Sequence, residues 1–463
     1  MMSKRYDLLV IGSGHTGLEA ALEAARTGAR VAVVERERRV GGLCLRRGAP
    51  PTKMLQETAR QHSFMRRWAM VPPIGLSGAP TEVASLVTGG VDAAGAGRAS
   101  SLLAEVDRAG VDHVHGRARF VTPHRVAVTR VREPELSLDA ERIFVAVGSC
   151  PAPPPSLTVD HETVLDTDSI RSLLYLPASM TVVGDGPSAC EWASTLSALE
   201  VLVTMVGHHP HPLPGWDPEL SATFVAALEA QGGRYCGDRD VRRVEIGDGG
   251  SVAALLDDGT TTVESAKMLY AGARRADVER LDLGCAGLTL DADGYIRADE
   301  TGRSCVPHIF VVGSAAGSRC PPPGRTTARH ALGLATKCTP TVMPGSVFSL
   351  PELATVGLDE ASARARGHDV VVGRAALADT VRGRLSGIER GFVKLVGDAE
   401  KGHLLGAQVA GPHATELVGQ AQLAVVHRLP VTTWLEHEFC FPTLGEAFCR
   451  AARDLVGSGG VAA

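Results

Sequence analysis

Short apolar runs that lead directly into glycines recur three times along the chain, and they predict its main elements. The first run, Leu8 to Ile11, precedes a glycine turn, an Ala- and Leu-rich stretch and a second apolar run, Val31 to Val34. The second occurrence is "SMTVVGDGPSACEWASTLSALEVLVTMVG", and the third is 308–312 in "VPHIFVVGSAAG". Continuous apolar runs are typical of parallel strands buried on both faces. The pattern therefore predicts α/β units of strand, turn and helix.

The first turn has the spacing Gly12-x-Gly14-x-x-Gly17, and the strand after its helix ends in Glu35. Glycines at this spacing let backbone N–H groups approach a pyrophosphate at the helix N-terminus. An acid about 20 residues further on is placed to accept hydrogen bonds from a ribose. Strand, turn, helix, strand and acid occur together, so the segment predicts a dinucleotide site.

The second turn reads Gly184-x-Gly186-x-x-Ala189 and predicts a second dinucleotide site. The strand after its helix is followed by histidines, the first of which is His208, and by no acid. An acid there would repel a 2′-phosphate, so its absence favours NADP over NAD. Histidine is a weaker phosphate ligand than arginine, and these histidines fit a solvated turn equally well.

Composition and charge argue against nucleic-acid-binding, membrane-spanning and metal-binding proteins. The net charge is −5 and no basic run stands out, so nucleic acid is not an expected partner. No apolar stretch approaches the ~18–20 residues of a membrane helix, and the N-terminal run is too short for a secretion signal. A cytoplasmic protein is therefore expected. The ten cysteines show no metal-binding or disulfide spacing, so we expect reduced thiols and no metal site.

Five motifs, in this order, resemble those of the pyridine nucleotide–disulfide oxidoreductases, the family of glutathione reductase, dihydrolipoamide dehydrogenase and soluble transhydrogenase. They are "GSGHTG" with Glu35, "FVAVGSCP" around Gly148, "GDGPSACEWA", "IFVVGSAAG" with Gly313, and "FPTLGEAF". The resemblance covers nearly the whole chain. It implies an α/β fold with two Rossmann-like domains, for FAD and NAD(P), and a C-terminal α+β dimerisation domain. The implied bounds are 1–153 and 284–345 (FAD), 154–283 (NAD(P)) and 346–463 (dimerisation).

The resemblance also implies a homodimer with FAD and NADP or NAD as cofactors. Gly42, in the glycine-rich turn "GGLC", falls in the flavin site. Lys53 matches the family's lysine beside flavin N5, and Glu191 matches its ion-pair partner on the nicotinamide side. We therefore expect that the residues for hydride transfer at the flavin are present.

Departures from the family pattern fall where disulfide chemistry occurs. Cys44 matches the first redox cysteine of the family's Cys-x4-Cys pair, but Ala49 replaces the second. Phe441 replaces the histidine of the acid–base pair, whereas its glutamate partner remains as Glu446. A phenylalanine transfers no proton, and a thiolate normally needs a base or a positive neighbour. We therefore expect no ordinary disulfide reductase activity.

Two further departures concern the cofactors. The aspartate that holds the flavin ribityl chain in the family is Ser314, so a charge-assisted contact is lost. Ala273 stands where the family usually has a glycine close to the nicotinamide. A bulkier residue there is expected to crowd the nucleotide.

Three functions remain open from the sequence. The first is hydride transfer from NAD(P)H through FAD to a non-disulfide acceptor, as in a transhydrogenase or diaphorase. The second is a flavin-dependent dehydrogenase or oxidase of a biosynthetic pathway, acting on a small or carrier-protein-bound substrate. There Cys44 would dock a thiol, and Cys440 beside Phe441, contributed by the other copy of the homodimer, would approach the same cavity. The third is a non-catalytic FAD-binding protein, for which Lys53 and Glu191 would not be needed. Cys44 fits an unreactive buried thiol as well as a docking group.

Overall fold

The computed structural model describes residues 4–46, 49–67, 97–317, 323–334 and 342–458. By its internal contacts the chain divides into two units. The first comprises Met1–Met54, Val83–Ala152 and Ala273–Thr339, and the second comprises Leu55–Glu82, Pro153–Gly272 and Pro340–Ala463. The domain bounds given by the sequence remain a prediction. Within the described ranges, no helix combines the length and apolar character that crossing a membrane requires.

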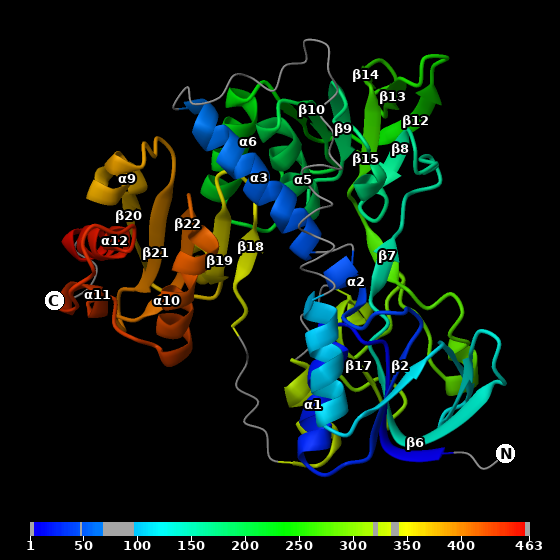
Figure 1. Ribbon diagram of the computed structural model, residues 1–463. Coiled ribbons are helices and arrows are strands. Elements are labelled where there is room, and N and C mark those ends of the chain that lie inside the picture. Colours follow the sequence, from blue (N-terminus) through cyan, green and yellow to red (C-terminus); the bar gives the residue numbers. More distant parts are fainter. Residues whose placement is uncertain (1–3, 47–48, 68–96, 318–322, 335–341, 459–463) are drawn as a thin grey trace. The chain divides into compact units, whose positions relative to one another are not determined.

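The first unit is built on a seven-stranded sheet in the order β3-β2-β1-β6-β5-β4, with β17 also paired to β6. Figure 1 labels its strands β2, β6 and β17. The pairs β1–β2, β1–β6 and β6–β17 are parallel, as the continuous apolar runs of β1, β2 and β17 predict. β4 and β5 form an antiparallel extension from β6. A separate ribbon pairs β7 with β16. The bounds are β1 Lys4–Ile11, α1 His15–Arg26, β2 Val31–Glu35, α2 Gly42–Arg46, β3 Asp112–His115, β4 Arg117–Thr122, β5 Arg125–Thr129, β6 Leu136–Val145, β7 Ser149–Pro151, β16 Arg274–Ala276, β17 Ile309–Val311 and α7 Gly324–Ala331. α3 (Ala49–Arg67) begins in this unit and continues into the second.

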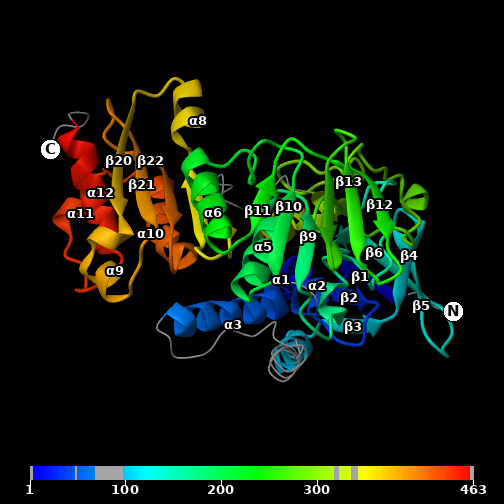
Figure 2. The same ribbon diagram turned by 90° about the horizontal axis from the view of Figure 1, so that it is seen from above.

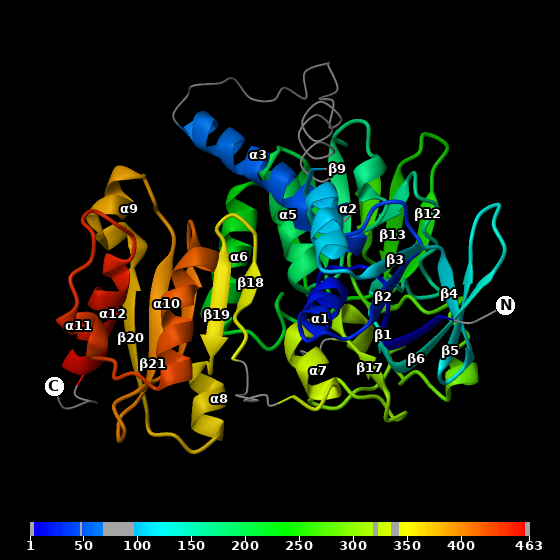
Figure 3. The ribbon, with the colours of Figure 1, turned by 60° about the horizontal axis from the view of Figure 1, so that its bottom comes forward.

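Strand β1 is buried on both faces, and that explains its continuous apolar run. Leu9 and Ile11 belong to the core on one side of the sheet, and Leu8 and Val10 belong to the core on the other. α1 packs on the second side, with α7 beside it (Figure 3). Burial on both faces is the usual situation of a parallel strand, so the sequence pattern and the observed layers agree.

The second unit contains a parallel sheet in the order β11-β10-β9-β15-β8 and a three-stranded antiparallel sheet, β12-β13-β14. Figure 2 shows β9, β10 and β11 side by side. The bounds are β8 Val164–Asp166, β9 Ser179–Val183, α5 Pro187–Ala198, β10 Leu202–Val206, α6 Pro218–Ala230, β11 Arg234–Cys236, β12 Val241–Ile246, β13 Val252–Leu256, β14 Thr262–Ser265 and β15 Lys267–Tyr270. This is the second strand–turn–helix–strand unit that the sequence predicts.

The same unit carries a five-stranded sheet in the order β18-β19-β22-β21-β20. α10 and α12 share one apolar core on one face of this sheet (Figure 3). The bounds are β18 Gly345–Val347, β19 Leu353–Gly357, α8 Glu360–Ala365, β20 Val370–Ala376, α9 Val381–Leu385, β21 Phe392–Asp398, β22 Leu404–Ala410, α10 Ala414–His427, α11 Thr433–Glu436 and α12 Glu446–Gly457. Short 3-10 turns complete the fold at Ile170–Ser172, Leu283–Ala286, Gly313–Ala316 and Leu377–Asp379.

Inside the second unit, a buried ion pair connects strand β21 with the start of helix α6. Lys394, on β21, is 3% exposed, and its Nζ lies 2.8 Å from Asp217 and 2.7 Å from Glu219. Burial disfavours its charge, but hydrogen bonds to both carboxylates raise the pKa of Lys394 above the usual value. Asp217 also caps α6 through the N–H of Glu219. The lysine therefore neutralises the carboxylate at the start of that helix.

Replacing Lys394 with Met is expected to lower the free energy of unfolding by about 3–5 kcal/mol. The reason is that Asp217, 2% exposed, would lose its cation. Urea unfolding followed by circular dichroism measures the change. Lys401→Met is the control, because Lys401 is exposed and lies 3.9 Å from Asp398. Such a pair is worth about 1 kcal/mol or less. Equal losses in the two variants would contradict a stabilising role for the buried pair.

Candidate functional site

The turn between β1 and α1 is closed by glycines that the sequence assigns to a dinucleotide. Gly12 has a φ of +104°, and a Cβ there would collide with the carbonyl oxygen of Ala146, directly after β6. A Cβ on Gly17 would lie 2.6 Å from the carbonyl oxygen of Gly12. Only glycine at both positions lets the helix begin this close to the sheet.

The N-terminus of α1 is open on the side of this turn. Gly14 is its N-cap, and no side chain accepts a hydrogen bond from the first N–H groups. A Cβ on Gly14 would meet no atom closer than the Ala146 oxygen, at 4.0 Å. The free N–H groups and the helix dipole favour a negative group, so the turn fits a pyrophosphate.

Glu35 lies at the end of β2, 4% exposed, and is tied to the same turn. One carboxylate oxygen accepts hydrogen bonds from the N–H and the hydroxyl of Ser13, at 2.9 and 2.5 Å. The other accepts from the N–H of Glu37 at 2.9 Å. The second oxygen accepts only this one bond from the described residues and retains acceptor capacity, which is what a ribose hydroxyl requires. Ser13, an unspecified position of the glycine motif, is a site residue that the sequence pattern did not identify.

The segment that carries Cys44 is attached to the glycine turn. The N–H of Gly41 donates to the carbonyl oxygen of Ser13 at 3.0 Å, and a Cβ on Gly42 would lie 2.7 Å from the Cα of Gly14. The backbone of Cys44 lies in α2, and Ala49 begins α3. The side chains of Cys44 and Ala49 lie outside the described residues, so their roles remain predictions.

The two later flavin motifs meet beside α1. A Cβ on Gly148 would lie 3.9 Å from the hydroxyl of Ser314, and a Cβ on Gly313 would lie 3.3 Å from the hydroxyl of Thr16, in the first turn of α1. Both glycines have positive φ values, +78° and +67°. Four segments distant in the sequence therefore converge on one place in the first unit: the glycine turn, the Gly42 turn, Gly148 and Ser314. Ser314 is exposed there, as a ligand-contacting side chain must be before the ligand binds.

The second unit repeats the glycine turn before α5. Gly184 has a φ of +133°, and a Cβ there would lie 2.8 Å from the carbonyl oxygen of Ala271. Gly186 is the N-cap of α5, again without a side-chain cap, and a Cβ on it would meet no atom within 4 Å. Ala189 is fully buried in the first turn of the helix. The open helix N-terminus fits the pyrophosphate of a second dinucleotide.

Glu191 follows on α5, half-buried, and one of its oxygens accepts from the N–H of Phe348 at 3.0 Å. Lys53 lies half-buried on α3 in the first unit, whereas Glu191 belongs to the second. Ala273 is exposed, and its carbonyl oxygen accepts from the N–H of Ala152 at 2.9 Å. The roles of these three residues toward flavin and nicotinamide remain predictions.

An acid that is distant in the sequence lies beside the end of β10. No acid directly follows this strand in the chain, but the carboxylate of Asp240 lies 2.8 Å from Nδ1 of His208. Asp185, inside the glycine turn, accepts from the N–H of His209 at 3.0 Å and lies 2.8 Å from its Nδ1. The hydrogen bond to Asp240 raises the pKa of His208 above its usual value. Asp240 comes 32 residues after His208, so no local pattern could have identified it.

The C-terminal motif lies at the start of α12. Phe441 is 75% exposed, and Cys440 beside it is exposed as well. Glu446 is bound by the guanidinium of Arg450, one helical turn later, with Nε 2.7 Å and Nη2 2.6 Å from its Oε1. Its Oε2 is buried and has no hydrogen-bond partner. The carboxylate that the family pairs with a histidine is here held by an arginine.

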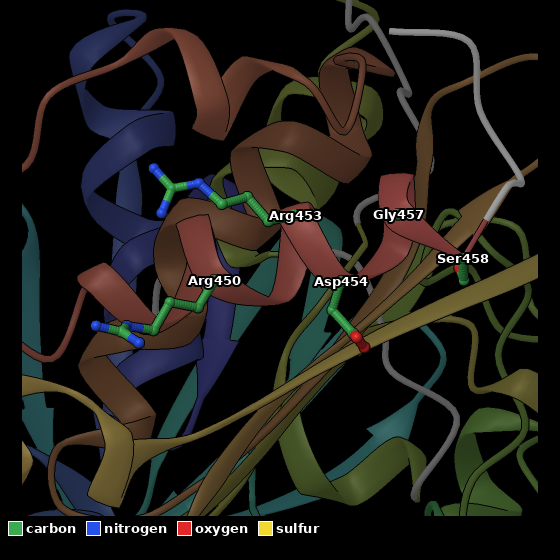
Figure 4. Close-up of a pocket in the computed structure, with 5 residues that line it drawn as sticks. All are labelled: Arg450, Arg453, Asp454, Gly457 and Ser458. Atoms are coloured by element: carbon green, nitrogen blue, oxygen red, sulfur yellow. The ribbon is translucent and has the colours of Figure 1, made fainter.

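A hollow of about 570 Å³ lies on the outer face of the same helix. Figure 4 shows its lining residues: Arg450, Arg453, Asp454 and Gly457 on α12, and Ser458 directly after it. Asp454 accepts from the backbone N–H of Arg374 at 2.9 Å. None of the residues that the sequence assigns to a cofactor lines this hollow. Among the described residues, no group of three His, Cys, Asp or Glu side chains is arranged to hold a metal ion.

Comparison with known proteins decides the family. Residues 6–341 match the pyridine nucleotide-disulphide oxidoreductases, and residues 343–452 match the dimerisation domain of the same proteins. The chain belongs to the pyridine nucleotide-disulphide oxidoreductase family.

Relatives match the chain over nearly its whole length. A soluble pyridine nucleotide transhydrogenase of Mycobacterium bovis is 32% identical over 467 residues, which cover 98% of this chain and 97% of the relative. A dihydrolipoyl dehydrogenase of Bacillus subtilis is 31% identical over 472 residues, 97% of this chain and 98% of the relative. The crystal structure of LpdA from Mycobacterium tuberculosis has a TM-score of 0.87 at 25% identity, covering 97% of this chain and 99% of the other.

Family membership confirms the expected fold class and the two cofactors. Members are FAD-dependent oxidoreductases that use NAD(P)H, and the matched dimerisation domain supports a homodimer. The residues of this chain fit both cofactors. Two open helix N-termini follow glycine turns, and Glu35 offers a buried carboxylate at the first turn.

Replacing Glu35 with Gln is expected to weaken FAD binding by about ten- to a hundredfold. The change removes a charged acceptor, and a hydrogen bond to a charged group contributes about 1.5–3 kcal/mol. Reconstitution of stripped protein with FAD, followed by flavin fluorescence, measures the affinity. Glu37→Gln is the control, because Glu35 uses only the backbone N–H of Glu37. Unchanged FAD affinity in Glu35→Gln would show that this carboxylate does not bind the cofactor.

Proposed function

We propose that the protein is an FAD-dependent oxidoreductase that moves hydride between NAD(P)H and an acceptor other than a disulfide. A second nicotinamide nucleotide is the first candidate for that acceptor. The name of the Mycobacterium bovis relative, a soluble pyridine nucleotide transhydrogenase, supports this choice.

The observation that carries the proposal is the state of the former acid–base pair. Dithiol–disulfide exchange requires a group that takes up and returns the proton of a thiol. Phe441 has no such group. The Arg450 guanidinium is bound to Oε1 of Glu446, so this oxygen is already engaged in an ion pair. Neither residue therefore replaces the missing histidine as a proton carrier.

The sequence at the thiol position points the same way. Electrons normally leave the flavin through the second cysteine, and Ala49 has no sulfur. Cys44 alone could form a mixed disulfide with a thiol but could not close an internal disulfide. Without the second thiol, an acceptor must contact the flavin directly.

The nucleotide side keeps what hydride transfer requires. FAD, when bound, supplies a ring that accepts and donates hydride. In this proposal, Lys53 lies beside that ring and Glu191 acts on the nicotinamide side. The hydrogen bond from the Phe348 N–H fixes one oxygen of Glu191, which limits the directions in which the carboxylate can act. In this way the protein positions the hydride donor and acceptor.

The proposal is tested with purified, FAD-loaded protein. Under anaerobic conditions NADH or NADPH is expected to bleach the flavin absorbance, and an oxidised nicotinamide analogue is expected to restore it. Oxidised lipoamide and glutathione disulfide are expected to restore it at least about a hundredfold more slowly, the contribution of a missing general base. Restoration by either disulfide as fast as by the nucleotide analogue would overturn the proposal.

Cys44→Ser separates the proposal from the thiol-docking alternative. Nucleotide-to-nucleotide transfer does not use a thiol, so its rate is expected to stay within about twofold of the unmodified protein. Stopped-flow absorbance of the flavin measures both half-reactions. Loss of flavin reoxidation in Cys44→Ser, with reduction by NAD(P)H intact, would instead favour an acceptor bound through Cys44.

A further inference from the structure

The loop after β10 brings together two histidines and two aspartates from three places in the sequence. His208 is bound to Asp240, which follows β11, and His209 is bound to Asp185 of the glycine turn, each across 2.8 Å. His208 and Asp240 are exposed, with 72% and 61% of their side chains accessible. Hydrogen bonds therefore fix the pair in a position where a ligand can reach it.

Asp185 relates this loop to the nucleotide site. It lies between Gly184 and Gly186, so its bonds to His209 hold the loop against the turn that precedes α5. In a dinucleotide-binding unit the pyrophosphate lies at this helix N-terminus, and the adenosine ribose lies at the end of the following strand. That strand is β10, which ends at Val206, two residues before His208. The 2′ position of the ribose thus falls beside His208 and Asp240.

The charges around this position are mainly negative. Asp185, Asp238 and Asp240 all act electrostatically on His208. Arg239 is a nearby cation, but its Nε lies 3.4 Å from Asp258 and its Nη1 donates to the carbonyl oxygen of Asp238 at 2.8 Å. A 2′-phosphate would meet carboxylates, whereas a 2′-hydroxyl could donate a hydrogen bond to one of them.

We propose that Asp240, positioned by His208, selects NAD(H) over NADP(H) at this site. Asp240 accepts a hydrogen bond from the ribose 2′-hydroxyl and repels a 2′-phosphate. Asp240 is distant from β10 in the chain, but it has the role that an acid directly after β10 has in other dinucleotide-binding units. The inference rests on the proposed function, because it concerns the nucleotide that delivers the hydride. It reverses the preference for NADP that the sequence alone suggests.

The test measures binding, without any acceptor. NAD+ and NADP+ are titrated separately into the FAD-loaded protein by isothermal calorimetry, both at the same pH and ionic strength. NAD+ is expected to bind more tightly. Asp240→Asn is expected to tighten NADP+ binding by about five- to tenfold, because one repelling charge is removed, and to weaken NAD+ binding by a few-fold.

Matched controls distinguish this role from general charge and from structure. Asp248→Asn removes one exposed charge in the turn after β12, and neither nucleotide is expected to change its affinity. His208→Asn, which frees Asp240, is expected to reduce the ratio of NAD+ to NADP+ affinity. His161→Asn, at another exposed histidine near an aspartate, is expected to leave that ratio unchanged.

Different results of the titrations and of the hydride-transfer assay contradict the inference and the proposed function. Tighter binding of NADP+ than NAD+ in the unmodified protein, or a ratio that Asp240→Asn leaves unchanged, would overturn the inference and leave the function standing. Preferential NAD+ binding that Asp240→Asn reverses, without hydride transfer to a second nucleotide, would support the inference and overturn the function. Binding of neither nucleotide would overturn both.

Discussion

The close contact between the β1–α1 turn and the end of β6 is the constraint on which the first unit depends. Gly12 passes over the carbonyl oxygen of Ala146, and Gly17 passes over the carbonyl oxygen of Gly12. This contact sets how close α1 comes to the sheet and where its N–H groups point. Gly42 packs on Gly14, and Gly313 lies beside Thr16, so the other flavin segments are placed relative to the same turn. A side chain at Gly12 would displace all of them together.

The exchange of a histidine for Phe441 has a structural counterpart that accounts for how Glu446 is retained. An unpaired carboxylate in a partly buried place is costly unless a cation or donor lies near. Arg450 lies one helical turn away on α12, the spacing at which a glutamate and an arginine form an ion pair. The glutamate therefore keeps a structural role at the helix N-terminus, where a negative charge is also favourable to the dipole.

Periodic and short-range patterns made much of the fold predictable. Apolar runs bounded by glycines gave β1, β2, β9, β10 and β17, because burial on both faces and tight turns leave direct traces in the sequence. Glu35 was found from its spacing to the turn. Ser13 and Asp240 were not found, since a motif leaves the first unspecified and chain folding brings the second to His208. Arg450 has a local signal, its spacing of four from Glu446, although the motif ends before it.

The motif positions that this chain shares with the family and those at which it differs have different chemical roles. Those that shape backbone around a dinucleotide are kept in both units as glycines with positive φ and open helix N-termini, and the first unit adds the buried acid Glu35. Those that handle thiol protons and electrons, at positions 49 and 441, are replaced by side chains that can do neither. A nucleotide site requires a rigid backbone, and rigidity depends on many contacts that tolerate little change. Thiol exchange depends on single side chains, which can be exchanged without disturbing those contacts. In the proposed function, this scaffold therefore lacks disulfide chemistry and still binds and orients a hydride donor at the flavin.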